Sequence, residues 1–200
     1  MKRITLGLTL CLVLGSCAEM QVKRDLAHVQ QSESYALATQ SGSKFDPANT
    51  CSKPPAFKSW VSYKFSPSSE IYQLPLATNA AAHCVEIPDN AKAIEIFGPS
   101  AGGMTYHEVT VVHPSILFLD KNYQLVDDLQ KPKLKAGQGM IRSFGVSAIV
   151  TLTSNLQRAR YAVIYVHPLS TGGEIDVYTG YETIPVPYGP YGEVRVRFFN

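Results

Sequence analysis

Histidines are the first residues of this chain to consider for acid–base or metal chemistry. His107 and His113 are an even number of positions apart, so a continuous strand would place both on one face. Pro114 directly follows His113, which argues against such a strand. His107 also adjoins Glu108, but neighbouring strand residues point to opposite faces and make a poor acid–base pair. We expect no metal site and no catalytic histidine here.

Carboxylates could serve a glycoside hydrolase if two of them faced one another across a cleft. The candidates near expected turns are Asp127, Asp128, Glu174, Asp176 and Glu193. Adjacent aspartates are typical of a solvated turn, and we interpret Asp127 and Asp128 in this way. The sequence contains no nucleophile elbow, zinc-protease motif or phosphate-binding loop. It therefore predicts no enzymatic activity and no cofactor, with a cell-wall hydrolase as the weaker alternative.

Tyrosines in the last quarter of the chain are the most promising binding residues. Tyr178, Tyr181, Tyr188 and Tyr191 lie in a segment rich in glycine and proline. Tyrosine has a flat apolar ring and a polar hydroxyl, which suits stacking on a sugar or anchoring a protein partner. In the alternative interpretation these rings cover strand edges, and for Tyr188–Tyr191 both remain open. Trp60, the one tryptophan, is expected to fill the core.

The N-terminus has the pattern of an export signal. Lys2 and Arg3 precede an apolar run, residues 4–14, which is too short to span a bilayer stably. The run ends in Leu-Gly-Ser-Cys, which resembles the bacterial lipobox, with Cys17 as the lipidated residue; an ordinary secretory signal is the alternative. Ala18 takes the place of the aspartate that retains such lipoproteins in the inner membrane. We expect a lipid anchor in the outer membrane that faces the periplasm, or the cell surface if the protein is flipped.

Cleavage before Cys17 changes the charge of the chain. The sequence of 200 residues has 18 Lys and Arg against 16 Asp and Glu, a formal net charge of +2. Loss of Lys2 and Arg3 makes these counts equal, so no basic surplus is left to attract nucleic acid. We expect three segments: a signal peptide over 1–16, a polar lipid-anchored tether over 17–55 and a folded domain over 56–200.

Cysteines support an oxidising compartment. Cys11 leaves with the signal peptide and Cys17 is the lipid site, so Cys51 and Cys84 remain. These two can pair in only one way, and we expect a disulfide. Two buried free thiols are the alternative. No close Cys/His spacing suggests a metal or redox motif.

The sequence of the domain predicts short strands separated by turns. Segments of alternating or continuous apolar residues, separated by Gly, Pro, Asn and Ser, predict an all-β fold: an antiparallel β-sandwich of about ten short strands. Ile116–Leu119 and Ala162–Val166 are apolar on both faces and are expected to be central core strands. Glu193–Phe198 alternates charged and apolar residues, as a half-buried strand requires. The expected strands are Trp60–Phe65, Ile71–Leu76, His83–Ile87, Ala91–Phe97, Met104–Val112, Ser115–Leu119, Met140–Thr153, Arg160–His167, Glu174–Thr179 and Glu193–Phe199.

Several of these strands resemble those of the periplasmic proteins of the bacterial maltose operon (the MalM family). The matching segments cover residues 57 to 199 in order: His113–Asn122, Gly145–Leu152, Arg160–Val166, Ile184–Pro187 and Gly192–Val196. The resemblance implies an extracytoplasmic protein associated with carbohydrate uptake, with no established catalytic activity. The lipobox and the cysteine pair depart from the family pattern.

These observations together predict a non-enzymatic lipoprotein. We expect it to assist uptake of maltose or maltodextrin by binding a glycan or a transport component, with the membrane contacted through its lipid. The alternative is an envelope structural or assembly lipoprotein that recruits a protein partner. Nucleic acid is not an expected partner, because the mature chain has no net positive charge.

Overall fold

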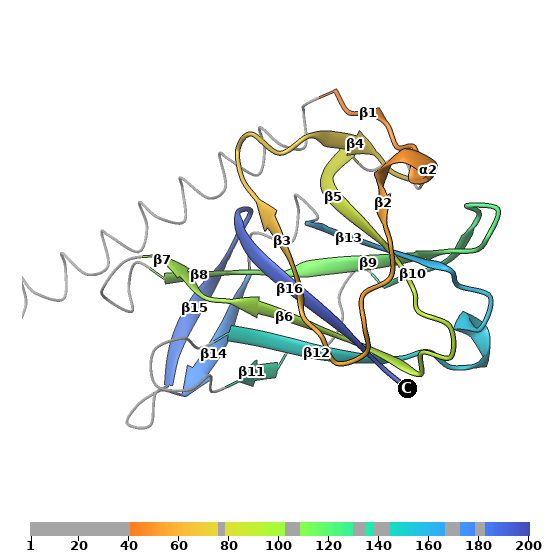
Figure 1. The fold of residues 1–200 in the computed structure, drawn as a ribbon. Helices are drawn as coiled ribbons and strands as arrows, with labels where there is room; N and C mark the ends of the chain where they lie inside the picture. Colours follow the sequence, from red (N-terminus) through yellow and green to blue (C-terminus); the bar gives the residue numbers. More distant parts are fainter. Residues whose placement is uncertain are drawn as a thin grey trace, which may run out of the picture.

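The computed structural model describes residues 41–75, 79–102, 109–129, 135–137, 145–166, 173–178 and 183–200. Within these ranges the chain is all-β, as expected, and its strands form two larger sheets and one smaller sheet (Figure 1). The helices there are one short α-helix, α2 (Pro47–Thr50), and a 3-10 turn, η2 (Ser154–Leu156). In this part of the chain no helix is long and apolar enough to cross a membrane.

The first sheet contains the two most deeply buried strands. Its order is β1-β4-β5-β13-β9-β10, and β2 also pairs with β5. Pairing is antiparallel except for β1 with β4 and β2 with β5, which are parallel. The strands are β1 (Ser43–Lys44), β2 (Cys51–Ser52), β4 (Ile71–Gln73), β5 (Asn79–Glu86), β9 (Pro114–Leu119), β10 (Leu125–Leu129) and β13 (Tyr161–Val166).

The second sheet is wholly antiparallel. Its order is β11-β12-β6-β16-β3. In β16 the alternation predicted from the sequence is confirmed, because Val194, Val196 and Phe198 are buried while the intervening residues are partly exposed. The strands are β3 (Val61–Phe65), β6 (Ala93–Pro99), β11 (Lys135–Gly137), β12 (Gly145–Thr151) and β16 (Gly192–Phe199).

A smaller sheet, with the order β14-β15-β8-β7, lies at one end of the molecule (Figure 1). Its strand β8 approaches β6 of the second sheet closely. A Cβ atom at Gly98 would lie 3.0 Å from the carbonyl oxygen of Val112, so the glycine makes this approach possible. The strands are β7 (Ala101–Gly102), β8 (Val109–Val112), β14 (Glu174–Tyr178) and β15 (Thr183–Gly189).

The main core lies between the two larger sheets. Ile116, Phe118 and Ile164 of the first sheet pack in one cluster with Ile94, Ile96, Val196 and Phe198 of the second. The opposite face of the first sheet is also buried: Leu117, Leu119, Val163 and Tyr165 form a second cluster with Phe45. Strands β9 and β13 are thus covered on both faces, which confirms their prediction as central strands.

A local interpretation of the sequence was wrong. Asp127 and Asp128 do not lie in a turn but in the edge strand β10, opposite Phe118 and Leu117. Charged residues on an edge strand discourage pairing with another chain, and the register shift between Leu125 and Asp127 adds to this effect.

Strand β15 is not among the strands expected from the sequence. Pro185 and Pro187 both lie in it, opposite Asp176 and Glu174 of β14. Proline lacks the N–H that a ladder needs, and it is accepted in strands where that N–H would face away from the partner.

Candidate functional site

The two cysteines predicted to pair do so. Cys51 and Cys84 form a disulfide that joins β2 to β5, with their Cα atoms 4.3 Å apart. Cys84 is buried in the second hydrophobic cluster and Cys51 packs at its edge. The disulfide therefore joins the end of the segment predicted to be a tether to the middle of the first sheet. Since β1 and β2 are strands of this sheet, the folded part of the chain begins before residue 56, where the sequence placed it. Cys17, the predicted lipid site, lies outside the described residues.

The four tyrosines predicted to bind a ligand are not brought together in the described part of the chain. Tyr181 lies outside that part, and only the backbone of Tyr178 is described. Tyr178 pairs with Thr183 at one end of β15, whereas Tyr188 lies five positions further along, roughly 17 Å away.

Tyr188 and Tyr191 are both engaged with the interior. The Tyr188 ring contacts His113 edge to face, with centroids 4.7 Å apart, and burial raises the pKa of its hydroxyl. Tyr191 packs against the main core. These contacts favour the interpretation that the two rings cover strand ends.

The histidines do not form a metal centre in the part of the chain that is described. His113 is buried next to Tyr188, and His107 lies outside the described residues. Among the described residues, no three His, Cys, Asp or Glu side chains are close enough to share a metal ion.

The outer face of the second sheet offers a different set of binding residues. We call this surface the Trp60 face. A central row crosses the sheet from the start of β3 over β16 and β6 to β12, and it consists of Trp60, Arg197, Glu95 and Ile149. The face also includes the surrounding residues Phe97, Phe199, Arg195 and Glu193. The register puts Arg197 opposite Glu95, and Glu95 opposite Ile149. Trp60 immediately precedes β3, whose Val61 is opposite Val196. The first four residues thus form a row across the sheet, about 14 Å wide at the usual strand spacing.

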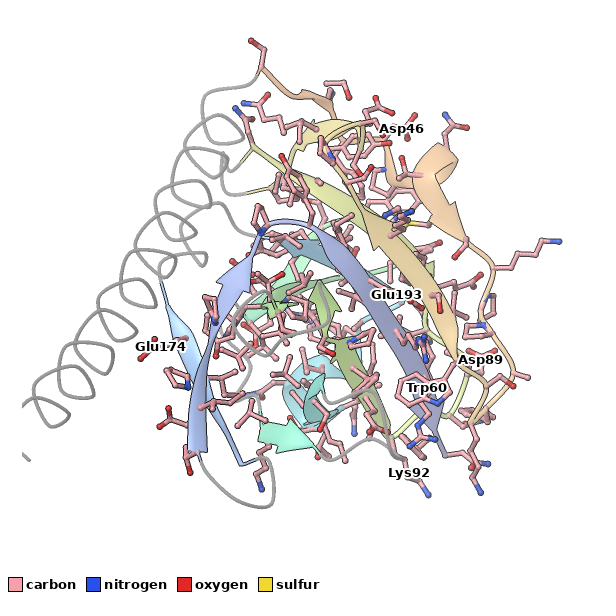
Figure 2. The ribbon with its side chains drawn as sticks, turned by 90° about the vertical axis from the view of Figure 1, so that its left-hand side faces the viewer. Asp46, Trp60, Asp89, Lys92, Glu174 and Glu193 are labelled. Carbon is pink, nitrogen blue, oxygen red and sulfur yellow. A yellow bond between two sulfur atoms is a disulfide. The ribbon has the colours of Figure 1, made fainter. Side chains whose placement is uncertain are left out.

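Trp60 lies on this face and not in the core, contrary to the sequence prediction, and 39% of its surface is exposed. The guanidinium carbon of Arg197 lies 4.3 Å from the centre of the Trp60 ring and 5.0 Å from that of Phe199, a cation–π arrangement. Phe97 adds a tilted aromatic contact to Trp60 at 6.1 Å. Figure 2 shows Trp60 and Glu193 on the same side of the molecule, over β16 and β3.

The sequence held a signal for this position. Val61, Tyr63 and Phe65 alternate along β3 and their side chains turn to the interior, so the residue before Val61 must point outwards. The preceding turn supports this orientation, because the N–H of Lys58 donates to the carbonyl oxygen of Phe198 at 2.9 Å. The size and hydrophobicity of Trp60 favoured a place in the core, but the alternation of side chains along β3 places position 60 on the outer face of the sheet.

Two ion pairs fix the charged groups of the Trp60 face. Arg197 Nε donates to Glu95 Oε2 at 2.7 Å, and both side chains are mostly covered. Arg195 donates to Glu193 through Nε at 2.7 Å and through a second nitrogen at 3.3 Å. The hydrogen bonds from Arg195 lower the pKa of the Glu193 carboxyl, and the same contact raises the pKa of Arg195. The two ion pairs therefore hold all four side chains in place on the sheet.

This arrangement suits binding. A partly exposed indole, fixed carboxylates and fixed guanidinium groups lie side by side on a sheet. An aromatic ring can stack against an apolar surface of a ligand, while the charged groups beside it make strong hydrogen bonds. At the far end of the row Ile149 is 66% exposed, the most exposed large apolar side chain in the described chain.

Comparisons with known proteins assign no family: no protein-family model matches the chain, and no curated protein matches it.

Proposed function

We propose that this chain is a non-enzymatic lipoprotein of the outer membrane that assists carbohydrate uptake by binding a glycan or a transport component, with the Trp60 face as its binding surface. The observation that carries this proposal is the partly exposed Trp60 ring, held by Arg197 and flanked by two ion pairs. The resemblance to the maltose-operon proteins supports maltodextrin as the first ligand to test.

A glycan fits the chemistry of this face. One side of a sugar ring presents C–H groups that pack on an aromatic ring, and the hydroxyls need donors and acceptors at the ring edge. The ion pairs Arg197–Glu95 and Arg195–Glu193 supply both kinds of group. Because each pair is already neutral as a unit, the face suits an uncharged polyhydroxylated ligand better than a charged one.

The attachment of the domain agrees with this use of the face. β1 and β2, which lie at the C-terminal end of the segment expected to be the tether, pair with the first sheet. The Trp60 face belongs to the second sheet, on the other side of the main core. The predicted tether therefore enters the domain through the first sheet, on the layer opposite the Trp60 face.

Titration of residues 18–200 with maltodextrins tests glycan binding. Trp60 is the sole tryptophan, so its emission reports this face directly, and calorimetry gives an independent measurement. We expect heat of binding and a shift in emission. Trp60→Ala should remove the heat, whereas Tyr123→Ala, a matched aromatic residue that is 36% exposed, should preserve it. Absence of both heat and an emission change in the unmodified chain would show that glycan binding at this face is wrong.

The lipid anchor is tested separately in cells. Labelled palmitate should be incorporated into the chain, and Cys17→Ser should abolish incorporation and move the protein out of the membrane fraction. Cys11→Ser, which alters the other cysteine of the N-terminal segment, should leave both unchanged. Label that persists in the Cys17→Ser variant would refute lipidation at this residue.

We propose, as a second candidate function, recruitment of an envelope protein partner through the same face. The specific observation is the exposure of Ile149, since large apolar, Trp and Arg side chains are the groups that dominate protein interfaces. A photo-crosslinking residue at position 149 should capture one abundant envelope protein in cells. The same residue at position 125, where Leu125 is 39% exposed on the first sheet, serves as control; equal capture at both positions would count against the face.

A further inference from the structure

Two solvent-accessible tyrosines that the binding proposal does not use lie against each other on the first sheet. Tyr123 belongs to the turn between β9 and β10, and Tyr161 begins β13. Their ring centroids are 5.0 Å apart and the ring planes are inclined by 36°. The neighbouring Tyr123 side chain raises the pKa of Tyr161. Tyr123 is 36% exposed and Tyr161 is partly exposed, so solvent reaches the pair.

The turn holds Tyr123 over Tyr161 at a conformational cost. Tyr123 has φ 61°, in the left-handed region that bulky residues seldom adopt. Asp120 stabilises this conformation, because its Oδ1 accepts hydrogen bonds from the N–H groups of Asn122 at 2.8 Å and Gln124 at 2.9 Å. The N–H of Tyr123 donates to the carbonyl oxygen of Asp120 at 3.0 Å. The N–H of Asp120 donates to the carbonyl oxygen of Gln124 at 2.9 Å. The ring of Tyr123 is thus preorganised next to its neighbour.

Tyr161 is equally well positioned. Its backbone lies between β5 and β9, opposite Glu86 and Leu119, so the strand cannot shift without breaking the centre of the first sheet. The tyrosine ring packs at the edge of the second hydrophobic cluster. Two phenols held in contact by separate rigid elements react with each other far faster than two free phenols, because no encounter is needed.

We propose that Tyr123 and Tyr161 form an oxidative cross-linking site at which hydrogen peroxide, used by a haem peroxidase, produces dityrosine. Each phenol loses one electron and its hydroxyl proton, and the two radicals couple through the ring carbons next to the oxygens. The ring hydrogens at these carbons then move to the oxygens, which restores both hydroxyls. In total one carbon–carbon bond forms, two hydrogen atoms leave, and the peroxide is reduced to two water molecules. The product would link the turn between β9 and β10 covalently to β13.

The test is oxidation of the full chain, purified in detergent at low concentration, with peroxide and a haem peroxidase. We expect dityrosine fluorescence in the monomer. After trypsin digestion, the peptides that begin at Asn122 and at Tyr161 should be joined, with a mass two hydrogen atoms below their sum. Tyr123→Phe and Tyr161→Phe should each lower the monomer signal roughly tenfold or more, since the preorganised partner is gone. These variants keep the aromatic ring, and unchanged thermal melting would show that they keep the fold.

Tyr72→Phe is the matched control. Tyr72 is also partly exposed in the first sheet, but its aromatic neighbour is Phe45, at 5.6 Å, and its hydroxyl donates to Glu70. This variant should give the same dityrosine yield as the unmodified chain. Cross-links only between molecules, no cross-link at all, or a monomer signal that survives in Tyr161→Phe would each overturn the proposal.

Discussion

Removal of the Cys51–Cys84 disulfide should lower the stability of the domain by a measurable and calculable amount. The bond closes a loop with a sequence separation of 33 residues. On the chain-entropy model such a loop contributes about 3.7 kcal/mol to the free energy of unfolding at 25 °C. For a domain of this size that loss corresponds to a fall in melting temperature of about 7 to 15 °C. We expect the double variant Cys51→Ala, Cys84→Ala to show a loss of this order.

The loss of stability should exceed this loop-closure contribution if β1 and β2 depend on the disulfide for their attachment to the first sheet. β1 and β2 have two residues each, and Phe45 is the buried apolar anchor between them. Cys84 is itself buried, and alanine at this position leaves part of its volume empty, which adds a further cost.

Urea unfolding, followed through Trp60 emission and circular dichroism, measures the change. The unmodified chain with its disulfide reduced provides the same comparison without a substitution. A loss below about 1 kcal/mol, in both the double variant and the reduced chain, would refute the loop-closure account of this bond.

Three further substitutions test other parts of the structure. Burial lowers the pKa of His83, so just below pH 6.5 the unfolded state binds more protons than the folded state. The free energy of unfolding should therefore fall as the pH drops below 6.5. Urea titrations at several pH values should show this slope in the unmodified chain and lack it in His83→Phe. Tyr165→Phe removes a hydroxyl that donates to Asp128 at 2.9 Å and should lower the free energy of unfolding by about 1 to 3 kcal/mol. In a double-mutant cycle with Asp128→Asn the two losses should be coupled, and strictly additive losses would contradict the hydrogen bond. Gly145→Ala places a Cβ atom 2.6 Å from the carbonyl oxygen of Gly98 and should lower stability by about 1 to 3 kcal/mol in thermal melts, whereas unchanged melting would contradict the close approach of β12 and β6.

The strand pattern and the cysteine pair were predictable because their signals are local or have one solution. Apolar residues on both faces of Ile116–Leu119 identified a strand that is covered on both sides, and the alternation in β16 identified its buried face. Two cysteines left over from the signal and lipid sites could pair in only one way, and they do. The domain segments have no helical period, and this pattern alone favoured strands over helices.

The position of the candidate site depended on how distant strands lie together. Trp60, Glu95, Ile149 and Arg197 are far apart in the sequence, and only the antiparallel register of β12, β6 and β16, with Trp60 entering β3, makes them one row. Composition pointed to the C-terminal tyrosines, two of which pack into the interior instead. Residue type and alternation are properties of one segment, so they determine which residues share a face of a strand. Which face is open to solvent, and which side chains from other strands lie beside it, follows from the order and layering of the sheets.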